Sequence, residues 1–301
     1  MAFLGGVIGF AVGLVLIAAV ATVLGASLAV FPEWVISLIP AAFGTFAASD
    51  PILALAFIVA IIILLQVSLY IIATAALADE VNCATTNPCR PTRLRDNPLE
   101  LLVRGIFFGL NSAFNFGIWA MLAPETGILA ILFGAVPFLA VIPDLARNRI
   151  YHAVLGWVAW LLPASYPATI VGLLLFLLNA PFAILAVGVS AIRLDVTTGV
   201  IETTGGIINI AGYSGGFSLG NFTFLANMGG LAGQGSFTGP SVSSHEIGHS
   251  LNTAAFGGIM LWINAVDENV PPFRRLQKSY GEVTADSHSG LPGHMYVSLW
   301  G

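Results

Sequence analysis

Charged residues are scarce in this chain. Asp, Glu, Lys and Arg together account for 8% of its 301 residues, whereas soluble globular domains carry roughly a quarter. This scarcity excludes an ordinary soluble domain. The ten Lys and Arg residues form no basic face, and nucleic-acid binding depends on clustered positive charge. We therefore expect no nucleic-acid partner.

Cysteine is also rare. The chain has two, Cys83 and Cys89, and their spacing matches neither a zinc knuckle nor a redox pair. In an oxidising compartment the two can close a small disulfide, whereas in the cytosol they stay free thiols. The compartment that their loop faces decides between these alternatives.

Hydrophobic residues, by contrast, make up 57% of the chain. A bilayer crossing takes about 20 apolar residues, which makes the lipid bilayer the expected partner of the first two thirds. The fourth and fifth apolar stretches are short, so tilted helices, half-helices or a re-entrant pair stay open for them. The first stretch is too long for a signal-peptide core and has no charged segment before it, which favours a retained helix. The six stretches are Phe3–Val30, Ile52–Leu77, Leu101–Leu122, Gly127–Ile142, Ile150–Leu162 and Ala168–Val189.

The positive charges alternate between the loops that join these stretches. They lie in or beside the segments that follow the second, fourth and sixth stretches, and the intervening loops at 32–50, 123–126 and 163–167 hold none. Six crossings with both termini in the cytosol would produce this alternation. We therefore predict an integral protein of the cell (inner) membrane, with reduced cysteines. The positively charged residues are Arg90, Arg93, Arg95, Arg104, Arg147, Arg149, Arg193, Arg274, Arg275 and Lys278.

The composition changes after residue 189. Short β-prone runs, "GVIETT", "GIINIAG" and "NFTFLA", alternate with glycine turns, which predicts strands and hairpins. Two helices are expected to follow, in "GPSVSSHEIGHSLNTAAF" and "FRRLQKSYGEVTADSHSG". We therefore predict two domains: a transmembrane helical domain at 1–189, and a small α+β domain at 190–301 that contains a Gly-rich β region.

The first of these helices carries His245-Glu246-x-x-His249. Residues i and i+4 lie on one face of a helix, so both imidazoles can bind one metal ion. Glu246, beside the first ligand, can take a proton from a metal-bound water, which is how this motif works in zinc peptidases. The alternative is that both histidines are polar residues on a solvent-facing helix.

A catalytic zinc site needs a third protein ligand. Glu282 and Asp286, again four residues apart, lie on the second expected helix. Glu282 can complete the metal site, and Asp286 can accept the free ring N–H of a ligand histidine. Two carboxylates on a solvated helix surface are the alternative, with Asp267 and Glu268 as nearby competitors. The longer metzincin pattern is absent after His249.

Together, His245-Glu246-x-x-His249 and Glu282-x-x-Ala285-Asp286 resemble the gluzincin arrangement. They are similar in particular to the membrane-bound HtpX-like and CAAX-prenyl-protease-like peptidases. The resemblance implies a zincin-like fold for the C-terminal domain, with zinc bound by His245, His249 and Glu282. It also implies Glu246 as general base and Asp286 as support for a ligand. Here the apolar stretches all precede the motif, so the substrate class does not carry over.

The sequence thus predicts a polytopic membrane zinc metallopeptidase that hydrolyses peptide bonds of a membrane or membrane-proximal protein. A further hydrogen-bond donor would stabilise the oxyanion of such a reaction, and His288, His294 and Tyr280 are the local candidates. The main alternative is a non-catalytic scaffold or transporter-like protein with a structural zinc, and an inactive peptidase-like binding module is another. A structural site has no use for Glu246. The sequence does not determine the oligomeric state.

Overall fold

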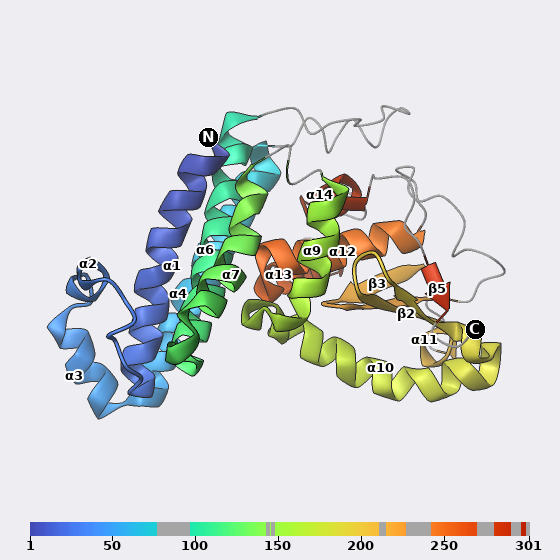
Figure 1. Cartoon of the computed structure of the whole chain (residues 1–301), viewed down its shortest axis with the longest axis horizontal. Coiled ribbons are helices and arrows are strands. Elements are labelled where there is room, and N and C mark those ends of the chain that lie inside the picture. Colours follow the sequence, from blue (N-terminus) through green and yellow to red (C-terminus); the bar gives the residue numbers. More distant parts are fainter. Residues whose placement is uncertain are drawn as a thin grey trace. The chain divides into compact units, whose positions relative to one another are not determined.

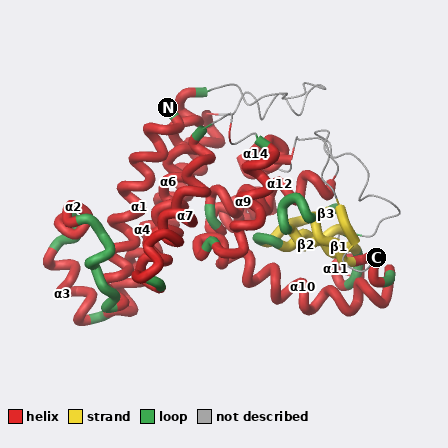
Figure 2. The backbone as a smooth tube through the Cα atoms, in the orientation of Figure 1, coloured by secondary structure: helices red, strands yellow, loops and turns green. Residues whose placement is uncertain are grey.

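A computed structural model describes residues 1–76, 97–142, 145, 148–210, 215–226, 242–269, 280–289 and 296–298. The chain divides into two compact units, one built from Met1–Ala76 and Asp96–Pro143 and the other containing Asp144–Gly301. The described part of the first unit is helical, whereas the strands belong to the second (Figure 2).

The first unit contains three long apolar helices. Helices α1, α4 and α6 each have the length and hydropathy needed to cross a membrane, and shorter helices connect or flank them. In chain order the elements are α1 (Ala2–Leu24), α2 (Glu33–Ser37), α3 (Ala41–Ser49), α4 (Pro51–Ala76), α6 (Pro98–Leu122), the 3₁₀ turn η1 (Pro124–Thr126), α7 (Gly127–Phe138) and the 3₁₀ turn η2 (Leu139–Val141).

Glycines bring α1 and α6 into direct backbone contact. A Cβ added at Gly9 of α1 would lie 2.1 Å from the carbonyl oxygen of Ile106, and one at Gly105 of α6 would lie 2.0 Å from that of Ala2. Both distances are far below van der Waals contact, so only glycine permits this approach. Small residues spaced four apart are the usual means by which apolar helices pack without a hydrophobic driving force between them.

The second unit places helices on both faces of a small sheet. The strand order is β3-β4-β2-β1-β5; β2 and β4 are parallel and the other pairs are antiparallel. Its elements are α9 (Arg149–Val158), η3 (Ala159–Leu161), η4 (Pro163–Ser165), α10 (Tyr166–Val187), η5 (Val189–Ala191), β1 (Ile192–Asp195), β2 (Val200–Thr204), α11 (Ile207–Ile210), β3 (Gly216–Leu219), β4 (Phe222–Leu225), α12 (Val242–Phe256), α13 (Gly258–Asn269), α14 (Tyr280–Ser289) and β5 (Tyr296–Ser298).

The two faces of this sheet differ in chemistry. Phe222 and Phe224 of β4 belong to a buried cluster that includes Leu175 and Phe176 of α10. On the opposite face Val200 packs against Ile247 and Leu251 of α12. Because successive side chains of a strand point to opposite faces, β2 and β4 pack against α10 with one face and against α12 with the other. Figure 1 shows α10 and α12 on opposite sides of the strands.

Among the described residues, four helical segments rather than six are long and apolar enough to cross a membrane: α1, α4, α6 and Pro163–Val187. The predicted stretch at 127–142 forms the 12-residue α7, which at 1.5 Å per residue spans about 18 Å of a hydrocarbon core about 30 Å thick. The stretch at 150–162 forms the 10-residue α9. The structure thus agrees with a membrane protein but does not confirm six crossings.

The compact units divide near residue 143, not at residue 189 where the composition changes. The reason lies in packing. Helix α10 reads as a bilayer span in sequence, yet its Gly172 lies against β3, with an added Cβ 2.2 Å from the Leu219 carbonyl oxygen. Likewise α9 packs against α12. Both helices therefore belong to the unit that holds the sheet.

The predicted strands in "GVIETT" and "NFTFLA" are present as β2 and β4. The run "GIINIAG" was expected as a strand and instead begins with the short helix α11. Gly205 and Gly206, with φ of 80° and 86°, turn the chain out of the sheet after β2. The side chain of Asn179 then accepts a hydrogen bond of 2.8 Å from the Ile207 N–H, which holds the start of α11 against α10.

Candidate metal centre

Helix α12 presents His245 and His249 on one face, as their spacing predicted. Their Nε2 atoms lie 3.1 Å apart, and the two residues are only 9% and 7% exposed. Burial contradicts the alternative of two polar residues on a solvent-facing helix. The helix ends at Phe256, where Gly257 adopts a φ of 91° and donates its N–H to the Thr253 carbonyl at 3.0 Å, as C-terminal glycines commonly do.

Glu282 of α14 meets both imidazoles. Its Oε2 lies 2.9 Å from His245 Nε2, and its Oε1 lies 3.1 Å from His249 Nε2. The side chain of Glu282 is 16% exposed, so it is not a carboxylate on a solvated surface. Three side chains from two helices therefore bring their ligand atoms within 4.8 Å of one another.

The close crossing of α12 and α14 makes this meeting possible. A Cβ at Gly248, between the two histidines, would lie 2.2 Å from the Ala285 carbonyl oxygen, so the two backbones touch at this point. One turn further along α12, Asn252 Nδ2 donates to the Gly281 carbonyl at 3.2 Å and to Thr284 Oγ1 at 2.9 Å. These contacts flank Glu282 along α14 and fix its approach to the histidines.

Helix α13 holds the first turn of α14 from another side. Asn264 Oδ1 accepts a hydrogen bond of 3.1 Å from the Gly281 N–H, and its Nδ2 donates to Glu268. A Cβ at Gly281 would lie 2.0 Å from Asn264 Oδ1. Glu268, which competed with Glu282 for the third ligand position in the sequence, thus accepts a hydrogen bond from Asn264 instead. Tyr280, considered as an oxyanion donor, is fully buried with its ring against Phe256.

The three side chains fit a tetrahedral metal ion. Bonds of about 2.0–2.1 Å from one ion to imidazole nitrogen and carboxylate oxygen place the ligand atoms about 3.3 Å apart. The two Nε2 atoms lie 3.1 Å apart, close to this spacing, and each of them lies 2.9 or 3.1 Å from a different oxygen of the Glu282 carboxylate. Two neutral imidazoles can each donate one N–H to a carboxylate oxygen, but the approach of the two Nε2 atoms to 3.1 Å is then left without a hydrogen bond, whereas a shared metal ion accounts for it.

Electrostatics also makes the cluster suited to a cation. Burial disfavours the charged form of Glu282, but the nearby imidazoles outweigh it and lower the pKa of that carboxyl well below its usual range. Burial likewise opposes protonation of His249, yet the Glu282 charge raises the pKa of this histidine. The carboxylate thus stays ionised inside the protein, where a metal ion can use it.

Glu246 lies in a different setting on the same helix. It is 5% exposed, and burial raises the pKa of its carboxyl, while the charges of His249 and His245 oppose that rise only in part. Strand β3 runs directly against it: a Cβ at Gly216 would lie 2.7 Å from Glu246 Cγ. Ser218, two residues further on, donates its hydroxyl to the Glu246 carbonyl at 2.6 Å.

The first turn of α12 is tied to the sheet. Ser243 donates its hydroxyl to the buried carboxylate of Glu202 on β2, and the other oxygen of that carboxylate is paired with Arg193 on β1. A charge in the interior is tolerated when it is paired and hydrogen-bonded. Glu202 therefore connects two strands to the helix that carries the histidines.

Three other residues predicted for the site are described only in part or not at all. Asp286 and His288 belong to α14, but their side chains lie outside the described residues, as does His294. His152, a histidine outside both motifs, is buried, 2% exposed, on α9, which packs against α12. The amphipathic pattern of α9 was a signal for this burial, because Tyr151, His152 and Leu155 share one face.

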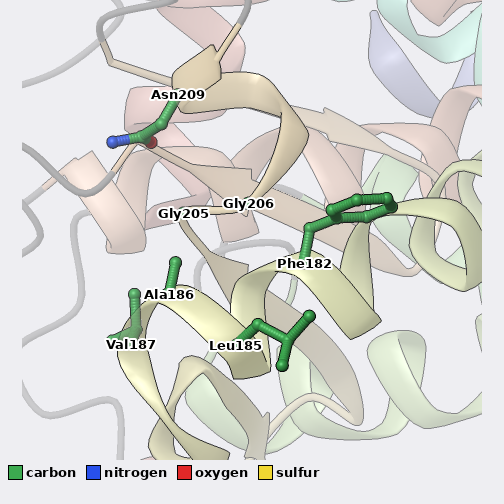
Figure 3. Close-up of a pocket in the computed structure, with 7 residues that line it drawn as sticks. All are labelled: Phe182, Leu185, Ala186, Val187, Gly205, Gly206 and Asn209. Carbon is green, nitrogen blue, oxygen red and sulfur yellow. The ribbon is translucent and has the colours of Figure 1, made fainter.

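A separate hollow of about 280 Å³ lies at the C-terminal end of α10 (Figure 3). Apolar side chains of α10 and the backbone of Gly205 and Gly206 line it, with Asn209 of α11 at its edge. No residue of the histidine–glutamate cluster is among its lining residues. The lining residues are Phe182, Leu185, Ala186, Val187, Gly205, Gly206 and Asn209.

Comparison of the chain with protein-family models, with curated proteins and with solved structures finds no match. The geometry of the described residues is therefore the basis on which a function can be proposed.

Proposed function

We propose that this protein is a membrane-bound zinc-dependent endopeptidase of gluzincin type. One observation carries the proposal: His245, His249 and Glu282 converge from two helices, and a buried carboxylate, Glu246, directly follows the first of them. The proposed setting is the cell (inner) membrane with both termini in the cytosol, and the four long apolar helices support the membrane part.

The residues suggest how hydrolysis would proceed. Zinc bound by the three ligands would supply a Lewis acid that activates water and polarises the peptide carbonyl. Glu246 accepts the proton of the attacking water and returns it to the leaving amine. The raised pKa of Glu246 suits a group that must both take and release a proton. The same ligand set also serves non-haem iron, and it is Glu246 that favours hydrolysis.

Strand β3 suggests how a peptide would be held. Among the described residues it is an outer strand, paired with β4 on one side, and its Gly216 touches the Glu246 side chain. An extended peptide can add to such an edge through backbone hydrogen bonds. The run "NFTFLA" forms β4, which lies between β3 and β2 and so has no free edge. The proposed substrate is a membrane or membrane-proximal protein.

The test uses the purified full-length protein in detergent. Metal content is measured by mass spectrometry, and hydrolysis is measured with a library of random quenched-fluorescent decapeptides. We expect one zinc per chain and cleavage of library members. Glu246→Gln should keep the zinc and lose hydrolysis, by about 100-fold to 10,000-fold for a general base, whereas His249→Ala should lose both.

Glu125→Gln is the matched control, because Glu125 is an exposed carboxylate in the other unit and its loss should change neither measurement. If Glu246→Gln keeps its zinc and cleaves as fast as the wild type, Glu246 is not the general base, and if the zinc-loaded wild type cleaves no library member, the peptidase is refuted. The scaffold with a structural zinc then takes its place. If the purified protein binds no zinc, both functions are refuted.

A further inference from the structure

Ser218 of β3 touches Glu246 twice. Its Oγ lies 2.6 Å from the main-chain carbonyl oxygen of Glu246 and 3.3 Å from Oε2 of its carboxylate. A third partner, Thr223 Oγ1 on β4, lies 3.2 Å away. Ser218 and Thr223 are buried, 6% and 0% exposed. A strand residue that is distant in sequence therefore contacts both the main chain and the side-chain carboxylate of Glu246.

One set of hydrogen-bond directions satisfies all three contacts. Each hydroxyl has one proton to donate and two lone pairs to accept with. When Thr223 donates to Ser218, the proton of Ser218 points to Glu246, where it lies between the carbonyl and the carboxylate. That position screens two oxygens of one residue from each other and restricts rotation of the Glu246 side chain.

The sheet register puts this contact in a buried polar row. Glu202 of β2 is the cross-strand partner of Thr223, and Thr223 is the partner of Ser218. Cross-strand partners point to the same face of a sheet, here the face that α12 covers. One end of the row holds Ser243 at the start of α12 through Glu202, and the other end holds Glu246 through Ser218.

We propose that Ser218 is a positioning residue for Glu246, supported by Thr223, and that it aims the carboxylate at the site formed by the two histidines and Glu282. The proposal rests on the proposed peptidase function for its catalytic meaning, but its structural content can be tested without hydrolysis. Nothing in the two sequence motifs points to Ser218, because it lies on a strand outside both of them.

The kinetic test compares Ser218→Ala with two matched variants. One decapeptide that the wild type cleaves is used for kcat and KM, and zinc affinity is measured by competition with a chelator. Ser218→Ala should lower kcat by about tenfold to 100-fold, the range typical of groups that orient a metal site, with KM and zinc affinity within twofold. Ser218→Thr, which keeps the hydroxyl, should restore kcat.

Thr203→Val is the control for loosening of the sheet. Thr203 directly follows Glu202 on β2 and is buried. Its side chain therefore points to the face of the sheet opposite to that of Glu202 and Ser218, and its hydroxyl has no partner among the described residues. The control should leave kcat unchanged. In the Glu246→Gln background, Ser218→Ala should cause no further loss. An equal loss of kcat in Thr203→Val, or weaker zinc binding in Ser218→Ala, overturns the positioning role.

A spectroscopic readout separates this proposal from the peptidase function. The visible absorption of the cobalt-substituted protein reports the surroundings of the metal, and Glu246→Gln should change it. Ser218→Ala should change it in the same way, whereas Thr203→Val should not. If neither the wild type nor any variant cleaves a peptide, the proposed peptidase function is refuted. In that case a spectrum of Ser218→Ala identical to the wild type would refute the positioning role separately.

Discussion

Replacing Gly248 by alanine tests whether the crossing of α12 and α14 sets the metal site. The added Cβ would lie 2.2 Å from the Ala285 carbonyl oxygen, whereas carbon–oxygen contacts shorter than about 3.3 Å are rare. The carbonyl is backbone and the position of a Cβ is fixed by its own backbone, so neither atom can rotate away. The two helices must therefore separate by about 1 Å.

A separation of this size removes the third ligand. Glu282 moves with α14, and metal–ligand distances tolerate only about 0.2 Å of change. We expect Gly248→Ala to weaken zinc binding by about 100-fold or more, since even displacement of groups that merely support ligands costs about tenfold to 100-fold. The helix itself should not suffer, because alanine is a better helix former than glycine by about 1 kcal/mol.

The assay is chelator competition for zinc on the full-length protein, with circular dichroism as a check that the helices persist. Gly44→Ala is the matched control: Gly44 is also a helical glycine, in α3, but nothing lies within 4 Å of an added Cβ. Wild-type zinc affinity in folded Gly248→Ala would refute the reasoning, since it would mean that Glu282 reaches the histidines without this close crossing.

Two further variants test the packing around the site and in the helical unit. Asn252→Ala removes two hydrogen bonds between α12 and α14 and should cost about 1–3 kcal/mol of stability, seen as a lower Tm in detergent. Asn269→Ala, which removes an exposed bond within one helix, should leave Tm nearly unchanged, and equal losses would contradict the assigned role of Asn252. Gly9→Val forces α1 away from Ile106 and should lower Tm of the helical unit far more than Gly44→Ala. A wild-type melting curve for Gly9→Val would show that α1 and α6 do not pack backbone to backbone.

Local periodicity made part of this protein predictable. The spacing of His245 and His249 places both imidazoles on one helix face whatever the rest of the chain does, and they are adjacent in the structure. The long apolar runs of α1, α4, α6 and α10 were equally plain, because a bilayer span is defined by length and composition. Strands β2 and β4 followed from β-prone runs between glycine turns.

The second motif already singled out Glu282 in the sequence, but its contact with the two histidines depended on tertiary structure. Asp267 and Glu268 precede it in the same region of sequence, and helix periodicity alone does not rank the three. The structure brings Glu282 to the histidines because Gly248 admits the α14 backbone and Asn252 holds it. A helix crossing is a contact between distant segments, and periodicity within one segment carries no information about it.

The sequence by itself determined which residues share a helix face and which runs are apolar enough for a membrane, since both follow from 1.5 Å of rise and 3.6 residues per turn. Only the tertiary structure decided that α9 and α10 belong with the sheet and that β3 rather than β4 is the outer strand beside Glu246. It also decided that Ser218 touches that carboxylate. Strand order and helix packing arise from long-range contacts, so they become visible only when the chain is folded.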